Sequence, residues 1–309
     1  MNDSERHIIG RRGALAVAFA LLIVQSCSTS APPPPAYQSM SSSADPLPAW
    51  LPGVWKREWI ERGGSRTSSF DVHYLQTPRA FADVRIPRER GALTHAASFA
   101  DLSDGELLLL ARQRGFTGMT TVAGNLATWH HEIDFQPADS SPDVGRMERL
   151  DDAHMLEHAL DSSYVESWRS VENGGGRFLS LRIERGGRID RVLVIAGNHF
   201  LYVRNRERDL PAAESLDSLI VSTKATRAQT IAYLDCEFSE GYVHGSADWE
   251  VQHSTLPWRE GRRLEIADSF VTNGGSLSLR APDPRGGVLS VPLNTFPRSE
   301  LKKMFERQR

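Results

Sequence analysis

Hydrophobic and polar residues alternate with a period of two along most of the chain beyond residue 49. Successive side chains of a strand point to opposite faces of a sheet, so this alternation predicts strands with one buried face. Gly-rich turns separate many of these segments. The predicted strands are Val54–Ile60, Phe70–Gln76, Phe81–Pro87, Thr117–Val122, Ala127–Phe135, Gly145–Leu150, Tyr164–Val171, Phe178–Glu184, Ile189–Ile195, Phe200–Arg206, Cys236–Val243 and Trp249–Ser254. Short strands joined in this way indicate an all-β antiparallel meander, closed as a barrel or packed as a sandwich.

Three short helices interrupt the predicted strands. Ser103-x-x-Glu106 and Thr226-x-x-Gln229 are capping boxes that open two of them, and Ser299–Arg307 is the third. The polar, helix-prone stretch 211–230 predicts a boundary between a barrel domain at 49–210 and a second, smaller β lobe or extension at 211–309. The alternative is that this stretch only connects two sheets of one domain.

The first 26 residues have the pattern of an export signal. Arg6, Arg11 and Arg12 precede Gly13–Val24, twelve residues without a charge. That run is shorter than the roughly 20 apolar residues that cross a membrane, so it predicts a removable signal peptide. Val24-Gln25-Ser26-Cys27 resembles the lipobox of bacterial lipoproteins, which implies lipidation at Cys27.

Alternatives to lipidation remain. They are a disulfide between Cys27 and Cys236, the only two cysteines, or cleavage by a signal peptidase at another position. The adjacent Arg11 and Arg12 also hint at a twin-arginine signal, although the flanking residues do not support one. With lipidation, Cys236 is left single as a small buried hydrophobic residue.

Residues 27–48 predict a tether. Ser28–Pro48 holds six prolines and six serines and almost no aliphatic side chains, so it cannot form a core. The sequence thus predicts an exported body held at the periplasmic face of the inner or outer membrane by its N-terminal lipid. The charge balance of 36 basic and 39 acidic residues argues against a nucleic-acid partner.

Several predicted strands carry large aromatic and charged residues on one face. Such faces suit the lumen of a barrel, where aromatic walls supply contact area and a few polar groups orient a ligand. The candidate ligand-binding residues are Trp55, Arg57, Tyr74, Asp83, Arg85, Trp129, Tyr164, Glu166 and Trp168. Two structural alternatives are an outward face on which Arg side chains cover aromatic rings, and an internal polar network that closes the barrel.

A family resemblance follows from these strands. Gly53-Val54-Trp55 opens the first strand and resembles the G-x-W motif of lipocalins and the wider calycin superfamily. Val72–Gln76, Phe81–Pro87, Ala127–Asp134 and Tyr164–Trp168 are similar to segments of the Hri-type lipocalin-like proteins. The resemblance implies one or two barrel-like lobes, a binding protein or interaction module without enzymatic activity, and a structural role for Trp55.

His154-Met-Leu-Glu157-His158 has the H-x-x-E-H pattern of inverted zinc peptidases. On a helix, His154 and His158 would share one side and hold Zn²⁺, with Glu157 as the general base. On a strand or turn, the histidines would simply be solvated. The β-rich body favours the second interpretation, so a zinc-dependent hydrolase ranks below the binding protein and the interaction module.

Other catalytic signatures are weak. A single histidine (His73, His131 or His199) could hold a haem or metal inside a barrel, but a hydrogen-bonded structural role is favoured. His130 and His131 point to opposite faces of a strand, so they cannot chelate one ion unless a β-bulge intervenes. Paired carboxylates such as Asp151 with Asp152 or Asp134 with Glu166 could act on sugars only at a separation that sequence cannot establish. We therefore predict no metal, cofactor or catalytic residue.

Overall fold

The computed structural model describes residues 46–139, 141–244 and 249–264, together with the backbone of four short strands beyond them. Those strands form two hairpins, β15 (Phe270–Asn273) with β16 (Ser276–Leu279) and β17 (Ala281–Asp283) with β18 (Gly287–Leu289). The predicted signal peptide, Cys27, most of the tether and the helix at Ser299–Arg307 lie outside the described residues.

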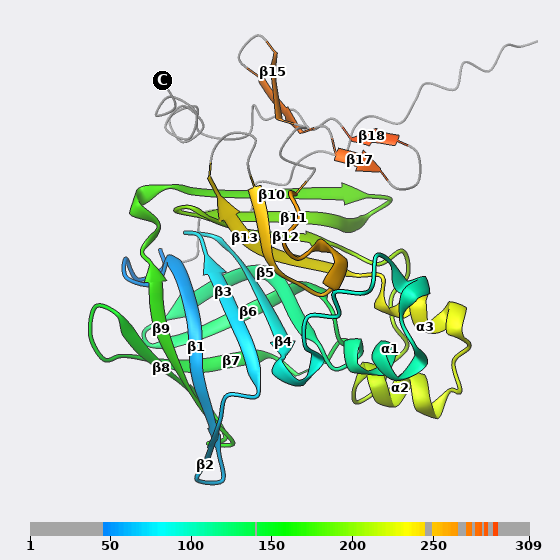
Figure 1. Cartoon of the computed structure of the whole chain (residues 1–309). Coiled ribbons are helices and arrows are strands. Elements are labelled where there is room, and N and C mark those ends of the chain that lie inside the picture. The colour runs from blue at the N-terminus through cyan, green and yellow to red at the C-terminus, as the bar shows by residue number, and fades with distance from the viewer. Residues whose placement is uncertain are drawn as a thin grey trace, which may run out of the picture. The chain divides into compact units, whose positions relative to one another are not determined.

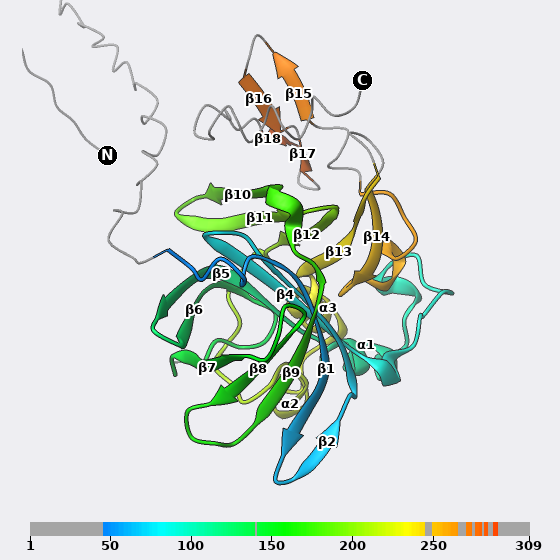
Figure 2. The same ribbon diagram turned by 90° about the vertical axis from the view of Figure 1, so that its left-hand side faces the viewer.

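The first part of the body is a closed antiparallel barrel (Figures 1 and 2). Neighbouring strands follow chain order, and β1 pairs with β9 to close the circle of eight strands, with the short β2 hydrogen-bonded to the end of β1. The strands are β1 (Gly53–Arg62), β2 (Ser65–Thr67), β3 (Phe70–Gln76), β4 (Ala80–Pro87), β5 (Arg114–Ala123), β6 (Leu126–Asp134), β7 (Asp143–Arg149), β8 (His154–Ala159) and β9 (Val165–Glu172). The predicted all-β fold and antiparallel meander are confirmed, and closure removes the exposed edges of the sheet.

A second sheet of five strands follows directly, in the order β10 (Phe178–Arg185), β11 (Arg188–Ala196), β12 (His199–Arg204), β13 (Glu237–Val243) and β14 (Trp249–Ser254). Its β11 to β14 contact β3 and β4 of the barrel. Val192 and Val194 of β11 pack with Leu75, Ala82 and Val84 of the barrel in one apolar core. The outer face of β3 and β4 is therefore buried as well as the inner face.

All twelve predicted strands are present. The structure adds the short β2, the hairpin strands β15 to β18, and β8, which the sequence left open between helix and strand. The helices α1 (Asp104–Leu110) and α3 (Arg227–Leu234) begin at the predicted capping boxes of Ser103 and Thr226. Helix α2 (Leu216–Ser222) was not predicted because its box pairs Ser215 with Ser218 instead of Glu or Gln. Within the described residues, no helix has both the length and the apolar character to cross a membrane.

The stretch 211–230 connects two strands of one sheet. It lies between β12 and β13, which pair with each other from His199↔Tyr242 to Arg204↔Glu237. The predicted boundary at 210/211 thus falls inside the second sheet, and the passage from the barrel to that sheet comes between β9 and β10. Periodicity alone does not reveal which strands pair across a long helical connection.

Two buried arginines link the barrel to the later part of the chain. Arg206 donates to the carbonyl oxygens of Phe135 at 2.6 Å, Asp134 at 2.7 Å and Tyr233 at 3.1 Å. Arg90 donates to the carbonyl of Ser254 at 2.6 Å. These charge-assisted hydrogen bonds satisfy backbone groups that burial would otherwise leave unpaired.

Candidate functional site

Aromatic side chains from separate strands meet inside the barrel. Trp129 of β6 donates its indole N–H to the Tyr74 hydroxyl of β3 at 3.1 Å, and the Tyr74 ring lies 5.9 Å from that of Trp168 on β9. These strands are not neighbours in the sheet, so the contacts cross the lumen. Trp55 joins the same cluster and donates its Nε1–H to the carbonyl of Leu51 at 2.8 Å. This hydrogen bond is compatible with the structural role that the resemblance implied for Trp55.

Charged side chains occupy the lumen beside the rings. Arg57 pairs with Glu166, and Arg85 lies 2.8 Å from Asp83 and 3.5 Å from Glu166 between the nearest atoms. Asp83 and Glu166 are 0% and 2% exposed. Burial raises the pKa of Asp83, and the Arg85 guanidinium opposes that rise. The network thus holds two guanidinium and two carboxyl groups in a water-poor environment, where pairing is required.

Three polar atoms of this interior lack a hydrogen-bond partner. They are Asp83 Oδ2, Glu166 Oε2 and Trp168 Nε1, all buried. Buried polar atoms in folded proteins are almost always hydrogen-bonded to protein, water or ligand. The interior therefore offers two acceptors and one donor to a small polar group.

Glu157 adds a titratable group to the lumen. It projects inward from β8, is 7% exposed and accepts a hydrogen bond from the Tyr164 hydroxyl at 2.9 Å. Burial and the nearby Glu166 carboxylate raise the pKa of Glu157 to about 8. At neutral pH, Glu157 is thus mainly the neutral acid.

All nine predicted wall residues lie in or at the edge of this interior. Eight of them are buried or carry buried contacts across the barrel, and Tyr164 reaches it through Glu157 from the half-buried position before β9. Strand alternation therefore placed these side chains on the correct face, and their predicted contact with a ligand stays a prediction. The internal polar network, weighed as a structural alternative, is also present.

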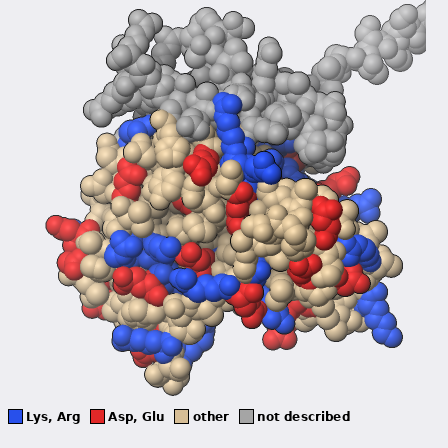
Figure 3. All heavy atoms as spheres, viewed as in Figure 1, with Lys and Arg blue, Asp and Glu red and all other residues tan. Residues whose placement is uncertain are grey.

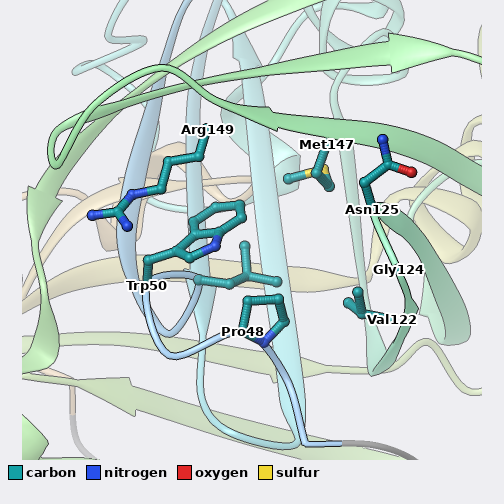
Figure 4. A pocket seen from close by; sticks show the side chains of 8 residues that line it. Pro48, Trp50, Val122, Gly124, Asn125, Met147 and Arg149 are labelled. Atoms are coloured by element: carbon teal, nitrogen blue, oxygen red, sulfur yellow. The ribbon is translucent and has the colours of Figure 1, made fainter.

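A pocket of about 230 Å³ opens at one mouth of the barrel (Figure 4). Figure 4 shows Trp50 next to Arg149, with Val122, Gly124 and Asn125 on the opposite side. The lining residues are Pro48, Trp50, Leu51, Val122, Gly124, Asn125, Met147 and Arg149. None of the nine predicted residues belongs to this set. Trp55 lies beneath it, because its ring makes an edge contact with Trp50 at 6.2 Å.

Sequence reasoning missed the pocket because most of its walls do not belong to one strand face: only Met147 and Arg149 stand two residues apart on one strand, β7. Pro48 and Trp50 come from the segment before β1, and Gly124 and Asn125 from the turn between β5 and β6. Turns that are distant along the chain meet only after the barrel closes. The one available signal was Trp50, a large aromatic residue just after a tether that holds few aromatic residues.

The zinc-peptidase interpretation of His154, Glu157 and His158 is wrong. All three residues lie on strand β8, where positions four apart are separated by roughly 13 Å. His154 pairs with Asp151 at 3.0 Å and His158 with Glu148 at 2.9 Å, on the outer face of the barrel. Glu157 points the opposite way, into the lumen. The three side chains therefore cannot hold one ion.

Of the single histidines, His131 has the hydrogen-bonded role that was favoured for it over haem or metal ligation. His131 lies between Asp134 at 2.6 Å and Asp143 at 3.0 Å. Burial alone would lower its pKa, but hydrogen bonds to both carboxylates outweigh burial and raise the pKa of His131 to about 9. Haem or metal ligation inside the barrel by His73 or His199 is excluded, because both side chains lie between the barrel and the second sheet.

Acidic and basic side chains are interspersed on the described part of the face in Figure 3. A face of mixed charge favours neither a polyanion nor a polycation as its partner.

Comparison with known proteins supplies limited context. No protein-family model matches the sequence, and no curated protein matches it significantly. The fold is similar to the crystal structure of the uncharacterised protein YLR301w of Saccharomyces cerevisiae, with a TM-score of 0.46 and 10% identity. That similarity covers 78% of this chain and 98% of the yeast chain. The closed eight-stranded antiparallel barrel is consistent with a calycin-like fold.

Proposed function

We propose that this chain is an exported, lipid-anchored, lipocalin-like protein that binds a small, partly apolar molecule at the mouth of its barrel. The observation that carries the proposal is the pocket between Trp50 and Arg149, formed where the segment after the tether crosses the barrel end. A closed barrel is compatible with ligand binding, since its mouth offers a concave, partly apolar site on a rigid scaffold. Export and lipidation rest on the N-terminal sequence, and the likeness to Hri-type proteins rests on the strand motifs.

The size and chemistry of the pocket indicate a compact ligand. About 230 Å³ is below the 300–1,000 Å³ typical of drug-sized ligands, so a molecule about the size of one ring with a short substituent fits best. Trp50, Leu51, Val122 and Met147 supply apolar contact. Asn125 offers hydrogen-bond donors, and so does Nη1 of Arg149, whose Nε and Nη2 already donate to the carbonyl of Asp151 and the carboxylate of Asp152. These donors favour a ligand with a carboxylate or another acceptor group.

The middle of the barrel does not favour a long ligand. The aromatic cluster and the Arg57–Glu166 pair fill the level below the pocket. A ligand at the mouth would therefore rest on Trp55 and Trp50 instead of passing through the barrel. This filled interior is also the observation that favours the second candidate function, an interaction module without a small ligand.

Native mass spectrometry of the full chain, purified in detergent, tests the proposal. We expect a bound small molecule that is lost from Trp50→Ala and Arg149→Gln. Arg146→Gln is the matched control because Arg146 lies on the same strand, β7, with an exposed side chain, and it should keep the ligand. A ligand retained by both pocket variants would refute the pocket. A protein that stays empty when it is isolated from its own membranes would favour the interaction module.

A further inference from the structure

Histidines and carboxylates gather between the barrel and the second sheet, outside the lumen. Asp71 and His73 come from β3, and His253 comes from β14. Glu240 of β13 and His199 of β12 lie behind them. These residues are separated by up to 182 positions along the chain and meet because the second sheet packs on β3 and β4.

Three of these side chains have the spacing of metal ligands. Asp71 Oδ1 lies 3.6 Å from His73 Nε2, and Asp71 Oδ2 lies 3.5 Å from His253 Nε2. One ligand atom from each residue lies within 4.8 Å of the others. Ligands at the corners of a tetrahedron around Zn²⁺ are roughly 3.3 Å apart for bonds of about 2.0–2.1 Å. Small side-chain adjustments would thus bring all three onto one ion.

His73 is an independent indication of a ligand. It is 8% exposed, and neither of its ring nitrogens has a hydrogen-bond partner. The nearest acidic oxygens, on Asp71 and Glu240, lie 3.6 Å and 3.8 Å away, beyond hydrogen-bond distance. An imidazole buried without a partner is costly. A metal ion bound to Nε2 would satisfy it.

Glu240 orients the histidines from behind. Its two oxygens lie 3.0 Å from His253 Nδ1 and 2.9 Å from His199 Nδ1, and the carboxyl group is 1% exposed. A carboxylate on one ring nitrogen commonly fixes a metal-binding histidine so that the other nitrogen faces the ion. In His253 that other nitrogen, Nε2, faces Asp71. A metal ion bound to Nε2 would take the place of a proton on that nitrogen.

The cluster is reachable from solvent on one side. The side chains of Asp71 and His253 are 22% and 29% exposed. Lys56 lies 2.8 Å from Asp71 Oδ1 and is 31% exposed, so its long side chain can move aside. Its positive charge balances the Asp71 carboxylate and would compete with a cation.

We propose that Asp71, His73 and His253 form a binding site for a divalent transition-metal ion, with Zn²⁺ as the best match to two imidazoles and one carboxylate. The ion would link strand β3 of the barrel to strand β14 of the second sheet, with Glu240 as the group that orients His253. The site is separate from the pocket at the barrel mouth, so its occupation does not depend on the proposed ligand.

Titration of the full chain with Zn²⁺ against a chromophoric chelator tests the site. We expect one equivalent to bind and to raise the midpoint of thermal unfolding. His253→Gln should weaken binding by about 100-fold or more and remove the thermal shift. His154→Gln is the matched control: it also removes a histidine beside an aspartate, but on the exposed face of β8, and it should bind as the unchanged chain does.

His73→Ala changes a buried residue, so the fold of this variant is checked first by circular dichroism. Glu240→Gln offers a second measurement, since loss of an orienting carboxylate should weaken Zn²⁺ affinity by about 10- to 100-fold. Lys56→Gln should strengthen binding by removing the competing charge. Binding that is unchanged in both His253→Gln and Glu240→Gln, or no stoichiometric binding by the unchanged chain, would overturn the proposal.

Discussion

Arg85 of β4 lies 3.5 Å from Glu166 of β9, although strands β1 and β3 separate β4 from β9 in the sheet. The pair therefore spans the inside of the barrel. Arg57 shares the same carboxylate, and Asp83 accepts from Arg85. Two positive and two negative groups balance in the lumen, and burial together with the nearby Glu166 carboxylate raises the pKa of the neighbouring Glu157.

The first prediction concerns this balance. Glu166→Gln leaves Arg57 without its carboxylate and Arg85 with Asp83 alone, in an interior that cannot hydrate them. Removal of one partner from a buried ion pair costs about 3–5 kcal/mol. We expect the free energy of unfolding, measured with urea, to fall by that amount. Glu61→Gln is the control, since Glu61 pairs with Arg66 on the surface and exposed pairs contribute about 0–1 kcal/mol. Equal effects of the two substitutions would contradict the role of the network.

The second prediction concerns pH. The pKa of Glu157 is about 8, above its ordinary value of 4.5, so the folded protein holds a proton that the unfolded chain releases between these values. The stability contribution of Glu157 is therefore complete below about pH 4.5 and is lost as pH rises to about 8, with a slope of at most about 1.4 kcal/mol per pH unit. Glu157→Gln should flatten the dependence of unfolding free energy on pH in this window.

Glu148→Gln serves as the comparison for Glu157. Glu148 lies on the neighbouring strand β7, but its side chain is 47% exposed and faces His158 outside the barrel. The Glu148→Gln substitution should leave the slope of unfolding free energy between pH 4.5 and 8 unchanged. Asp83 and His131, whose pKa values are also raised, should keep a smaller slope in Glu157→Gln, and a slope as steep as that of the unchanged chain would contradict the role of Glu157.

The third prediction tests how tightly the lumen is packed. A Cβ atom at Gly145 would lie 2.9 Å from Glu157 Cγ and 3.0 Å from Trp129 Cζ3. Gly145→Ala should therefore destabilise the fold by about 1–3 kcal/mol, the usual cost of overpacking. Gly105→Ala, in helix α1, meets nothing within 4 Å and should be neutral or stabilising by about 0.4–1 kcal/mol. Thermal unfolding of both variants measures whether each substitution destabilises or stabilises the fold. A Gly145→Ala variant as stable as the unchanged chain would indicate a looser interior.

The fourth prediction concerns the anchor. If Cys27 carries lipid, Cys27→Ser should abolish incorporation of an alkynyl fatty acid when the chain is expressed in a Gram-negative bacterial host. Cys236→Ser should keep the label, because Cys236 is buried in the body of the protein. Labelling that persists in Cys27→Ser, or is lost in Cys236→Ser, would refute lipidation at Cys27.

The strands and their inward faces followed from local pattern. Trp55 and Arg57, or Asp83 and Arg85, stand two residues apart, so any extended backbone sends each pair to one side. On the other side of these strands Val54, Ala82 and Val84 are also buried, so the structure gives them two buried faces where alternation predicted one. Alternation belongs to each segment separately, which is why the sequence sufficed for the fold class and for the side chains that share a face.

Two local ambiguities needed the structure. The H-x-x-E-H spacing of His154–Ala159 is compatible with a short helix, and its alternation is compatible with a strand. The segment is a strand because it pairs with both β7 and β9. In the same way, nothing near residue 211 shows that β12 and β13 will pair. Pairing depends on partners far away in the chain, which local propensity does not encode.

The sites depend on tertiary structure alone. Trp50 and Arg149 lie 99 positions apart and meet at one mouth of the barrel, while His73 and His253 lie 180 positions apart and stack with ring centroids at 4.3 Å. The sequence by itself determined most of the strand segments and which side chains of each strand share a face, because both follow from alternation along the strand. Only closure of the barrel and packing of the second sheet decided which of those side chains meet, because that depends on the register and order of strands.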